Sequence, residues 1–178
     1  MDQFELAANL NRDHLMHIAQ VLGLFPMKMS EIKDFEGGTY FDKMYLIDYQ
    51  FGDAFVQVKG MHQGFNTFTL PYPHLRRLQE LMDEDKPYPE FHVEMQFDAK
   101  GEIRAIGATS TALLCEIFSG QHRKIPFTKR DNAENPGRSF YVLEWEHFYP
   151  TGKMSVIWYS KAPQWMKSRK SRGVDMDL

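Results

Sequence analysis

One segment of the chain, residues 90–98 (EFHVEMQFD), alternates at every position between apolar and polar side chains. Successive side chains of a β-strand point to opposite faces of its sheet, so this pattern predicts a strand with one buried face and one solvated face. Ala99-Lys100-Gly101 then predicts a turn, after which residues 102–108 return as the second strand of a hairpin. The framework of the fold is therefore expected to be an antiparallel sheet.

Further strand patterns lie on both sides of this hairpin. Residues 39–70 contain three β-rich runs, which predict a three-stranded meander. Residues 138–148 and 153–162 bracket Tyr149-Pro150-Thr151-Gly152, which predicts a second hairpin. Its last strand is apolar on both faces, which indicates a central position or a covered second face. We expect the two hairpins to share one sheet.

Helical spacing occurs in two places. Leu15, Ile18, Ala19 and Leu22 recur at the period of a helix that Gly23 ends. A second helix is predicted near 73–84, with Pro73 in its first turn. Residues 109–118 fit either a short helix or another strand, because periodicity does not separate the two in so short a run.

These elements define an α+β protein with a single domain. A chain of 178 residues buries roughly 70% of its unfolded surface, and 43% hydrophobic residues supply a core. We predict a mostly antiparallel sheet of five to seven strands, with the N-terminal helix and the helix near 73–84 packed on one face. The domain covers residues 1–162, and residues 163–178 form a polar basic C-terminal tail. Residues 121–138 are expected to be a long exposed loop.

The sequence favours a soluble cytoplasmic protein with no membrane association. Its first residues are acidic and amide side chains instead of the basic head of a signal peptide, and no run reaches the ~18 apolar residues of a membrane span. The single cysteine, Cys115, lies in an apolar segment and is expected to be a buried, inert thiol. The oligomeric state stays open.

Motifs with a known catalytic mechanism are absent from the sequence, and no cofactor is indicated. One group of acidic residues and a histidine suggests a metal-binding site. If strands 90–98 and 138–148 were neighbours, carboxylates and an imidazole would converge on a divalent ion, as in a small metal-dependent hydrolase or nuclease. The favoured alternative is that these residues are the ordinary polar face of an antiparallel sheet. The candidate ligands are Glu90, His92, Glu94, Glu144 and Glu146.

Charge is distributed unevenly along the chain. Residues 1–119 hold 10 Lys and Arg against 18 Asp and Glu, whereas residues 120–178 hold 11 against 6. In proteins that bind single-stranded nucleic acid, cations contact the phosphate backbone and aromatic rings stack on the bases. The C-terminal part of the chain has this combination of residues. The alternative is an ordinary solvated surface. The candidate partner-binding residues are Arg123, Lys124, Lys129, Arg130, Arg138, Trp165, Lys167, Arg169, Lys170 and Arg172.

Three functions remain open. The first is a non-enzymatic binding or regulatory protein that contacts another protein through its sheet and the 121–138 segment, and the lack of catalytic motifs favours it. The second is a nucleic-acid-binding accessory factor that uses this segment and the basic tail. The third is the metal-dependent enzyme.

Overall fold

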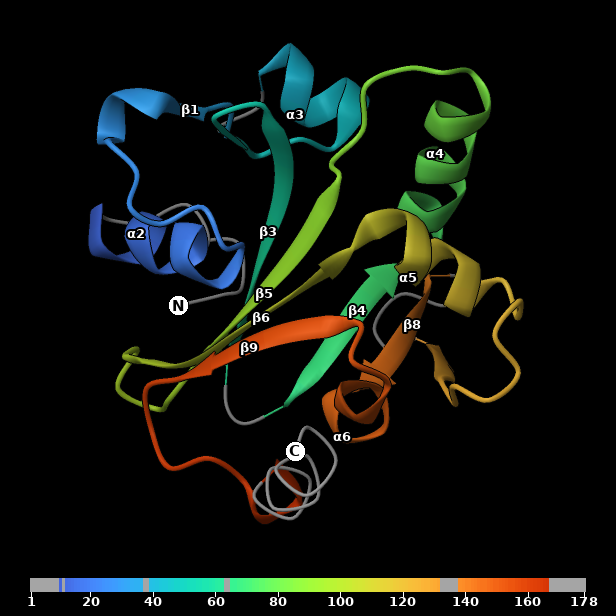
Figure 1. Ribbon diagram of the computed structural model, residues 1–178. Helices are drawn as coiled ribbons and strands as arrows, with labels where there is room; N and C mark the ends of the chain where they lie inside the picture. The colour runs from blue at the N-terminus through green and yellow to red at the C-terminus, as the bar shows by residue number, and fades with distance from the viewer. Residues whose placement is uncertain (1–9, 11, 37–38, 63–64, 132–137, 167–178) are drawn as a thin grey trace, which may run out of the picture.

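Two β-sheets organise the protein. The computed structural model describes residues 10, 12–36, 39–62, 65–131 and 138–166 (Figure 1). All neighbouring strands are antiparallel except β3 and β5, which are parallel. The predicted α+β class with a mostly antiparallel arrangement is therefore confirmed. Sheet A has the order β1 (Ile32–Asp34), β2 (Tyr49–Phe51), β3 (Ala54–His62), β5 (Phe91–Phe97), β6 (Ile103–Ser110) and β9 (Met154–Trp158), and sheet B has the order β4 (Thr67–Pro71), β8 (Ser139–Glu144) and β7 (Thr128–Asp131).

The two predicted helices are present. Helix α2 (Arg12–Val21) buries its apolar stripe, and the chain leaves it through Gly23 with φ +73°. Helix α4 (Tyr72–Asp83) has Pro73 in its first turn, where a missing N–H costs nothing. The ambiguous segment is helix α5 (Thr111–Phe118), because the Ser110 hydroxyl accepts the Leu113 N–H at 3.2 Å and caps its first turn.

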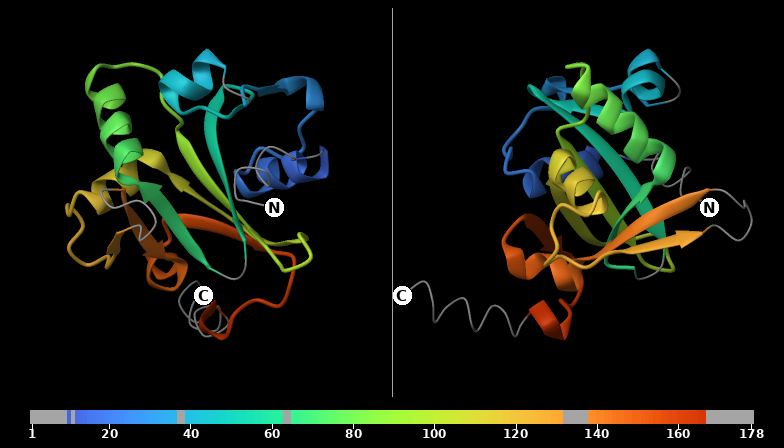
Figure 2. Two further views of the ribbon diagram at one scale, coloured as in Figure 1. Left: turned by 180° about the vertical axis from the view of Figure 1, so that it is seen from behind. Right: turned by 90° about the vertical axis from the view of Figure 1, so that its right-hand side faces the viewer.

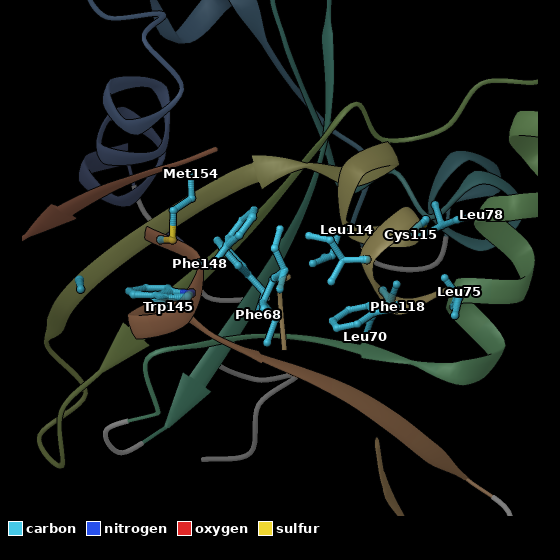
Figure 3. Packing of buried hydrophobic residues seen from close by; sticks show 14 residues of the cluster. Phe68, Leu70, Leu75, Leu78, Leu114, Cys115, Phe118, Trp145, Phe148 and Met154 are labelled. Atoms are coloured by element: carbon cyan, nitrogen blue, oxygen red, sulfur yellow. The ribbon is translucent and has the colours of Figure 1, made fainter. Parts of the chain in front are cut away.

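The two faces of sheet A bury different layers. Helix α2 covers one face, where its apolar side chains pack with Val58, Val93 and Met95. The other face lies under α4, α5, sheet B and the short helix α6 (Trp145–Phe148), with Leu75, Leu114 and Phe148 in a second cluster (Figures 2 and 3). Helices α2 and α4 thus belong to separate clusters instead of one shared helical layer.

The predicted meander over residues 39–70 is wrong in two places. Its first part is helix α3 (Tyr40–Tyr45), which Thr39 caps by accepting the Asp42 N–H at 3.3 Å. The hairpin of β2 and β3 is present, but β4 leaves sheet A and joins sheet B. A capping residue therefore outweighed the β-propensity of the aromatic run.

The predicted hairpin over residues 138–162 is also wrong. Strand β8 lies between β4 and β7 in sheet B, whereas β9 is the outer strand of sheet A beside β6. Between them α6 and the 3₁₀ turn η2 (Tyr149–Thr151) redirect the chain, because Trp145 and Phe148 are fully buried in the second cluster. Strand β9 contributes to both clusters, so its second face is covered as its composition indicates.

The remaining elements complete the described chain. The predicted hairpin of β5 and β6 is confirmed, and its register places Val93 opposite Ala108. The 121–138 segment contains strand β7, so it is not wholly a loop. A 3₁₀ turn, η1 (Met29–Glu31), leads into β1. None of the helices in the described ranges is long and apolar enough to cross a membrane.

Candidate functional site

The polar face of β5 is buried instead of solvated. His92 is 1% exposed, and Glu94 and Gln96 are fully enclosed. The reason is that β4, the outer strand of sheet B, lies against this face. The expectation of one wet face is thus wrong, and these side chains need partners within the protein.

Glu94 joins the two sheets. Its carboxylate accepts a hydrogen bond from the backbone N–H of Thr69, and its Oε1 accepts another from the Thr69 hydroxyl at 3.0 Å. Lys59 Nζ in turn donates to Thr69 Oγ1 at 2.7 Å. Burial lowers the pKa of Lys59, and the nearby Glu94 carboxylate opposes that shift. Hydrogen bonds from Thr69 to Glu94, with the half-buried Lys59 bonded to the same hydroxyl, therefore connect the edge of sheet B to the face of sheet A.

His92 is held in the same cluster through both ring nitrogens. Nε2 lies 3.0 Å from Glu94 Oε2, and Nδ1 lies 3.2 Å from Gln57 Oε1. Across the interface in α4, burial lowers the pKa of His74, with repulsion from Lys59 and His92 adding to the effect. Because His92 uses both nitrogens for protein contacts and is shielded from solvent, the arrangement fits a structural junction better than an acid–base centre.

The five proposed metal ligands do not come together. Glu90, Glu144 and Glu146 are exposed, while His92 and Glu94 are buried. Glu144 lies at the end of β8 in sheet B, where its Oε2 is 3.1 Å from His147 Nε2. Across the described part of the chain, no group of three or more His, Cys, Asp or Glu has the geometry to hold a metal ion. The hypothesis depended on β5 and β8 sharing a sheet, and they do not.

The basic segment presents an exposed outer strand. All four side chains of β7 are exposed, including Lys129 and Arg130, and Arg123, Lys124 and Arg138 are exposed on either side of it in the chain. Within the ranges that the structure describes, none of these five cations forms an ion pair. They are therefore available to a negatively charged partner.

An aromatic ring from α4 extends this surface. Lys129 Nζ lies 5.8 Å from the centre of the Tyr72 ring, and the Arg76 guanidinium lies 6.0 Å from it. Tyr72 is 37% exposed. We call β7 together with Tyr72 and Arg76 the basic edge. Sequence reasoning missed Tyr72 and Arg76, because only tertiary structure brings α4 beside β7.

The remaining candidates fall outside the basic edge. Trp165 packs against Trp158 and Tyr149, with ring centres 6.4 and 5.8 Å apart, so its ring is half-buried within the protein. Cys115 is buried as expected, and burial raises the pKa of its thiol to about 12. Four further candidates lie outside the described residues, namely Lys167, Arg169, Lys170 and Arg172.

Fold and site together define a two-sheet α+β protein with a buried polar junction and an exposed, positively charged outer strand. No family model, curated protein or solved structure matches this chain. The chemistry of the basic edge therefore decides which partner fits.

Proposed function

We propose that this chain is a non-enzymatic binding protein that receives an extended, acidic segment of another protein along β7. The observation that carries the proposal is an exposed outer strand whose cations form no ion pair with any described residue. An outer strand offers backbone N–H and C=O groups to a pairing segment, so main-chain hydrogen bonds supply affinity and side chains supply selectivity.

Charge favours an acidic partner over a second copy of β7. Two strands that each carry Lys129 and Arg130 repel when they pair, and charged outer strands generally prevent such self-association. A segment with Asp or Glu at alternate positions places its carboxylates on one face of the paired strands, opposite Lys129 or Arg130 according to register. Attraction of this kind also speeds association at low salt.

The aromatic side chains favour protein over nucleic acid. Single-strand binding relies on several rings that stack on successive bases. At the basic edge, Tyr72 is the large exposed aromatic side chain, and its ring already has Lys129 and Arg76 beside it. The C-terminal rings Trp158 and Trp165 pack on one another. Among the described residues of the basic edge, a nucleic acid would therefore find cations and a single exposed ring instead of a row of rings for stacking.

Two further features agree with a non-enzymatic protein in a cytoplasmic setting. The most suggestive acid–base pair, His92 and Glu94, is buried and bonded within the protein. The single cysteine is buried and needs no oxidising compartment, which is consistent with a cytoplasmic setting.

Calorimetric titration tests the proposal. The ligand is a capped peptide of about eight residues that alternates Glu with Val, long enough to pair with a short outer strand. Its control is the same sequence with two central Val replaced by Pro, which keeps the charge, removes donors and breaks the extended pairing. We expect saturable binding of the first peptide alone. Equal binding of both peptides, or tighter binding of an oligothymidine of equal charge, contradicts the proposal, and the latter result favours nucleic acid.

A further inference from the structure

Buried polar atoms without a partner gather in one region of the protein. In the described residues, seven buried side-chain nitrogen or oxygen atoms have no hydrogen-bond partner, and five of them belong to only four residues. Those four are Thr67, Gln96, Trp145 and Trp158, with Gln96 lacking a partner at both Nε2 and Oε1. Buried polar groups are normally satisfied, so such a concentration calls for an explanation.

Strand register brings two of these residues to one face. Gln96 of β5 lies opposite Ala105 of β6, and Ala105 lies opposite Trp158 of β9. Gln96 and Trp158 therefore share the face of sheet A that carries the second cluster, with a small alanine between them.

Trp145 closes this region from α6. Its ring centre is 6.0 Å from that of Trp158 and 5.5 Å from that of Phe68. Figure 3 shows Trp145 and Phe68 within the second cluster. The ring rests directly on Gly107 of β6, where a Cβ would approach Trp145 Cζ2 to 2.4 Å. Gly107 is two residues from Ala105 and so lies on the same face.

Thr67 approaches from β4. The neighbouring Asn66 carbonyl accepts the Trp145 backbone N–H at 2.9 Å. Thr67 precedes Thr69 by two residues, and Gln96 follows Glu94 by two, while β4 and β5 run in opposite directions in Figure 1. Because Thr69 bonds Glu94, the same alternation directs Thr67 toward Gln96.

The chemistry of these groups defines the ligand. Two indole N–H groups and the Gln96 amide nitrogen donate, the Gln96 oxygen accepts, and the Thr67 hydroxyl does both. Donors outnumber acceptors, and none of the four side chains carries a charge. An oxygen atom that accepts several hydrogen bonds satisfies them best.

We propose that Thr67, Gln96, Trp145 and Trp158 form an internal binding site for a small oxygen ligand. The oxygen belongs either to internal water, which commonly bridges such groups, or to the carbonyl or carboxylate of a small molecule retained at the sheet junction. In either case the ligand continues the polar contacts that begin at Lys59 and Glu94. Of the two indoles, that of Trp158 is half-exposed and packs against Trp165, whereas Trp145 is fully buried.

The first test measures thermal unfolding of Gln96→Leu in the full chain. Without the Gln96 amide, the bound oxygen and its other partners lose hydrogen bonds inside the protein. We therefore expect the melting temperature to fall by about 3–6 °C. Gln20→Leu, the same change at an exposed position of α2, is the control and should leave the melting temperature unchanged. If Gln96→Leu instead raises the melting temperature, the amide is simply unsatisfied and the proposal fails.

The second test identifies the oxygen. Each of the three tryptophans in the chain gives one indole N–H signal in ¹⁵N spectra, assigned by Trp→Phe variants. A cross-relaxation signal from water to the Trp145 indole N–H supports internal water. A stoichiometric small molecule in the mass spectrum of the denatured extract supports an organic ligand. If the Trp145 indole N–H gives no cross-relaxation signal from water and the extract contains no stoichiometric small molecule, the proposal is overturned.

Discussion

The hydroxyl of Thr69 in sheet B donates to the carboxylate of Glu94 in sheet A at 3.0 Å, and the Thr69 backbone N–H donates to the same group. An outer strand that abuts another sheet buries N–H groups that no neighbouring strand can accept. Glu94 supplies that acceptor, and Lys59 balances its charge. A buried carboxylate therefore supplies hydrogen bonds at a contact between the two sheets that is otherwise packed by apolar side chains.

Replacing Glu94 by Gln should destabilise the protein by about 1–3 kcal/mol, because an amide cannot accept from the Thr69 N–H and hydroxyl as the carboxylate does and the half-buried Lys59 loses its nearby countercharge. Chemical denaturation measures the change. Glu90→Gln, at an exposed position just before β5, is the control and should have little effect. Equal effects of the two variants would mean that the buried pair does not hold the sheets together.

Lys59 and Glu94 should also be energetically coupled. The Lys59→Met variant removes the buried cation, so adding Glu94→Gln to it should cost less than Glu94→Gln alone. A double-mutant cycle of unfolding free energies gives the coupling. Strict additivity would show that the two charges do not interact.

Gly107→Ala should cost about 1–3 kcal/mol, because the new methyl group would overlap the buried Trp145 ring. Denaturation measures the loss, and a changed tryptophan emission maximum reports the displaced ring. Combining Gly107→Ala with Trp145→Phe should cost less than the two single changes added together, since the smaller ring makes room. An unchanged emission spectrum and unchanged stability would contradict the close contact.

The acidic region beside α3 predicts a pH dependence of stability. Burial raises the pKa of Glu36 from 4.5 to about 7, against the opposing effect of the hydrogen bond that it accepts from the Tyr49 hydroxyl at 3.1 Å. The folded protein thus holds a proton that the unfolded chain releases between these values. This contribution to stability is complete below pH 4.5 and is lost as the pH rises through about 7.

Glu36→Gln keeps this side chain neutral at every pH. Relative to the wild type, the variant should therefore gain stability between about pH 5 and about pH 8, as urea unfolding would measure. Burial also raises the pKa of Asp48 and repulsion from Glu36 adds to that shift, so the variant removes the Glu36 part of the Asp48 shift as well. Glu102→Gln, exposed in the turn between β5 and β6, should show no such trend. A difference between Glu36→Gln and wild type that does not vary with pH would refute the assignment.

Alternation along residues 90–98 was sufficient to predict β5 and its pairing with β6, because side-chain period and turn chemistry are local properties. It could not reveal that sheet B covers the polar face, since alternation shows which side chains share a face and not what lies above it. The hairpin prediction for residues 138–162 was wrong for a related reason. Two strand-like runs close in sequence usually pair, but burial of Trp145 and Phe148 sends β8 and β9 to different sheets.

The basic edge was predictable in part. Lys129 and Arg130 lie in a run of charged and polar residues, and such runs are solvated in most proteins. Tyr72 and Arg76 gave no local signal, because an aromatic and a basic residue one helical turn apart occur on many helices. Their role depends on the contact between α4 and sheet B, which only the tertiary structure provides.

Reversing charge on β7 should abolish recognition of an acidic strand. The double variant Lys129→Glu with Arg130→Glu replaces a cation by an acid on both faces of β7. The Glu face of the alternating Glu and Val peptide is then repelled in either register, so we expect its affinity to fall at least about tenfold, with weaker salt dependence. Both side chains are exposed, so the melting temperature should not change. Lys100→Glu, exposed in the turn between β5 and β6, alters net charge away from β7 and serves as the control. If Lys100→Glu weakens binding as strongly, the peptide senses overall charge and the outer strand is not its site.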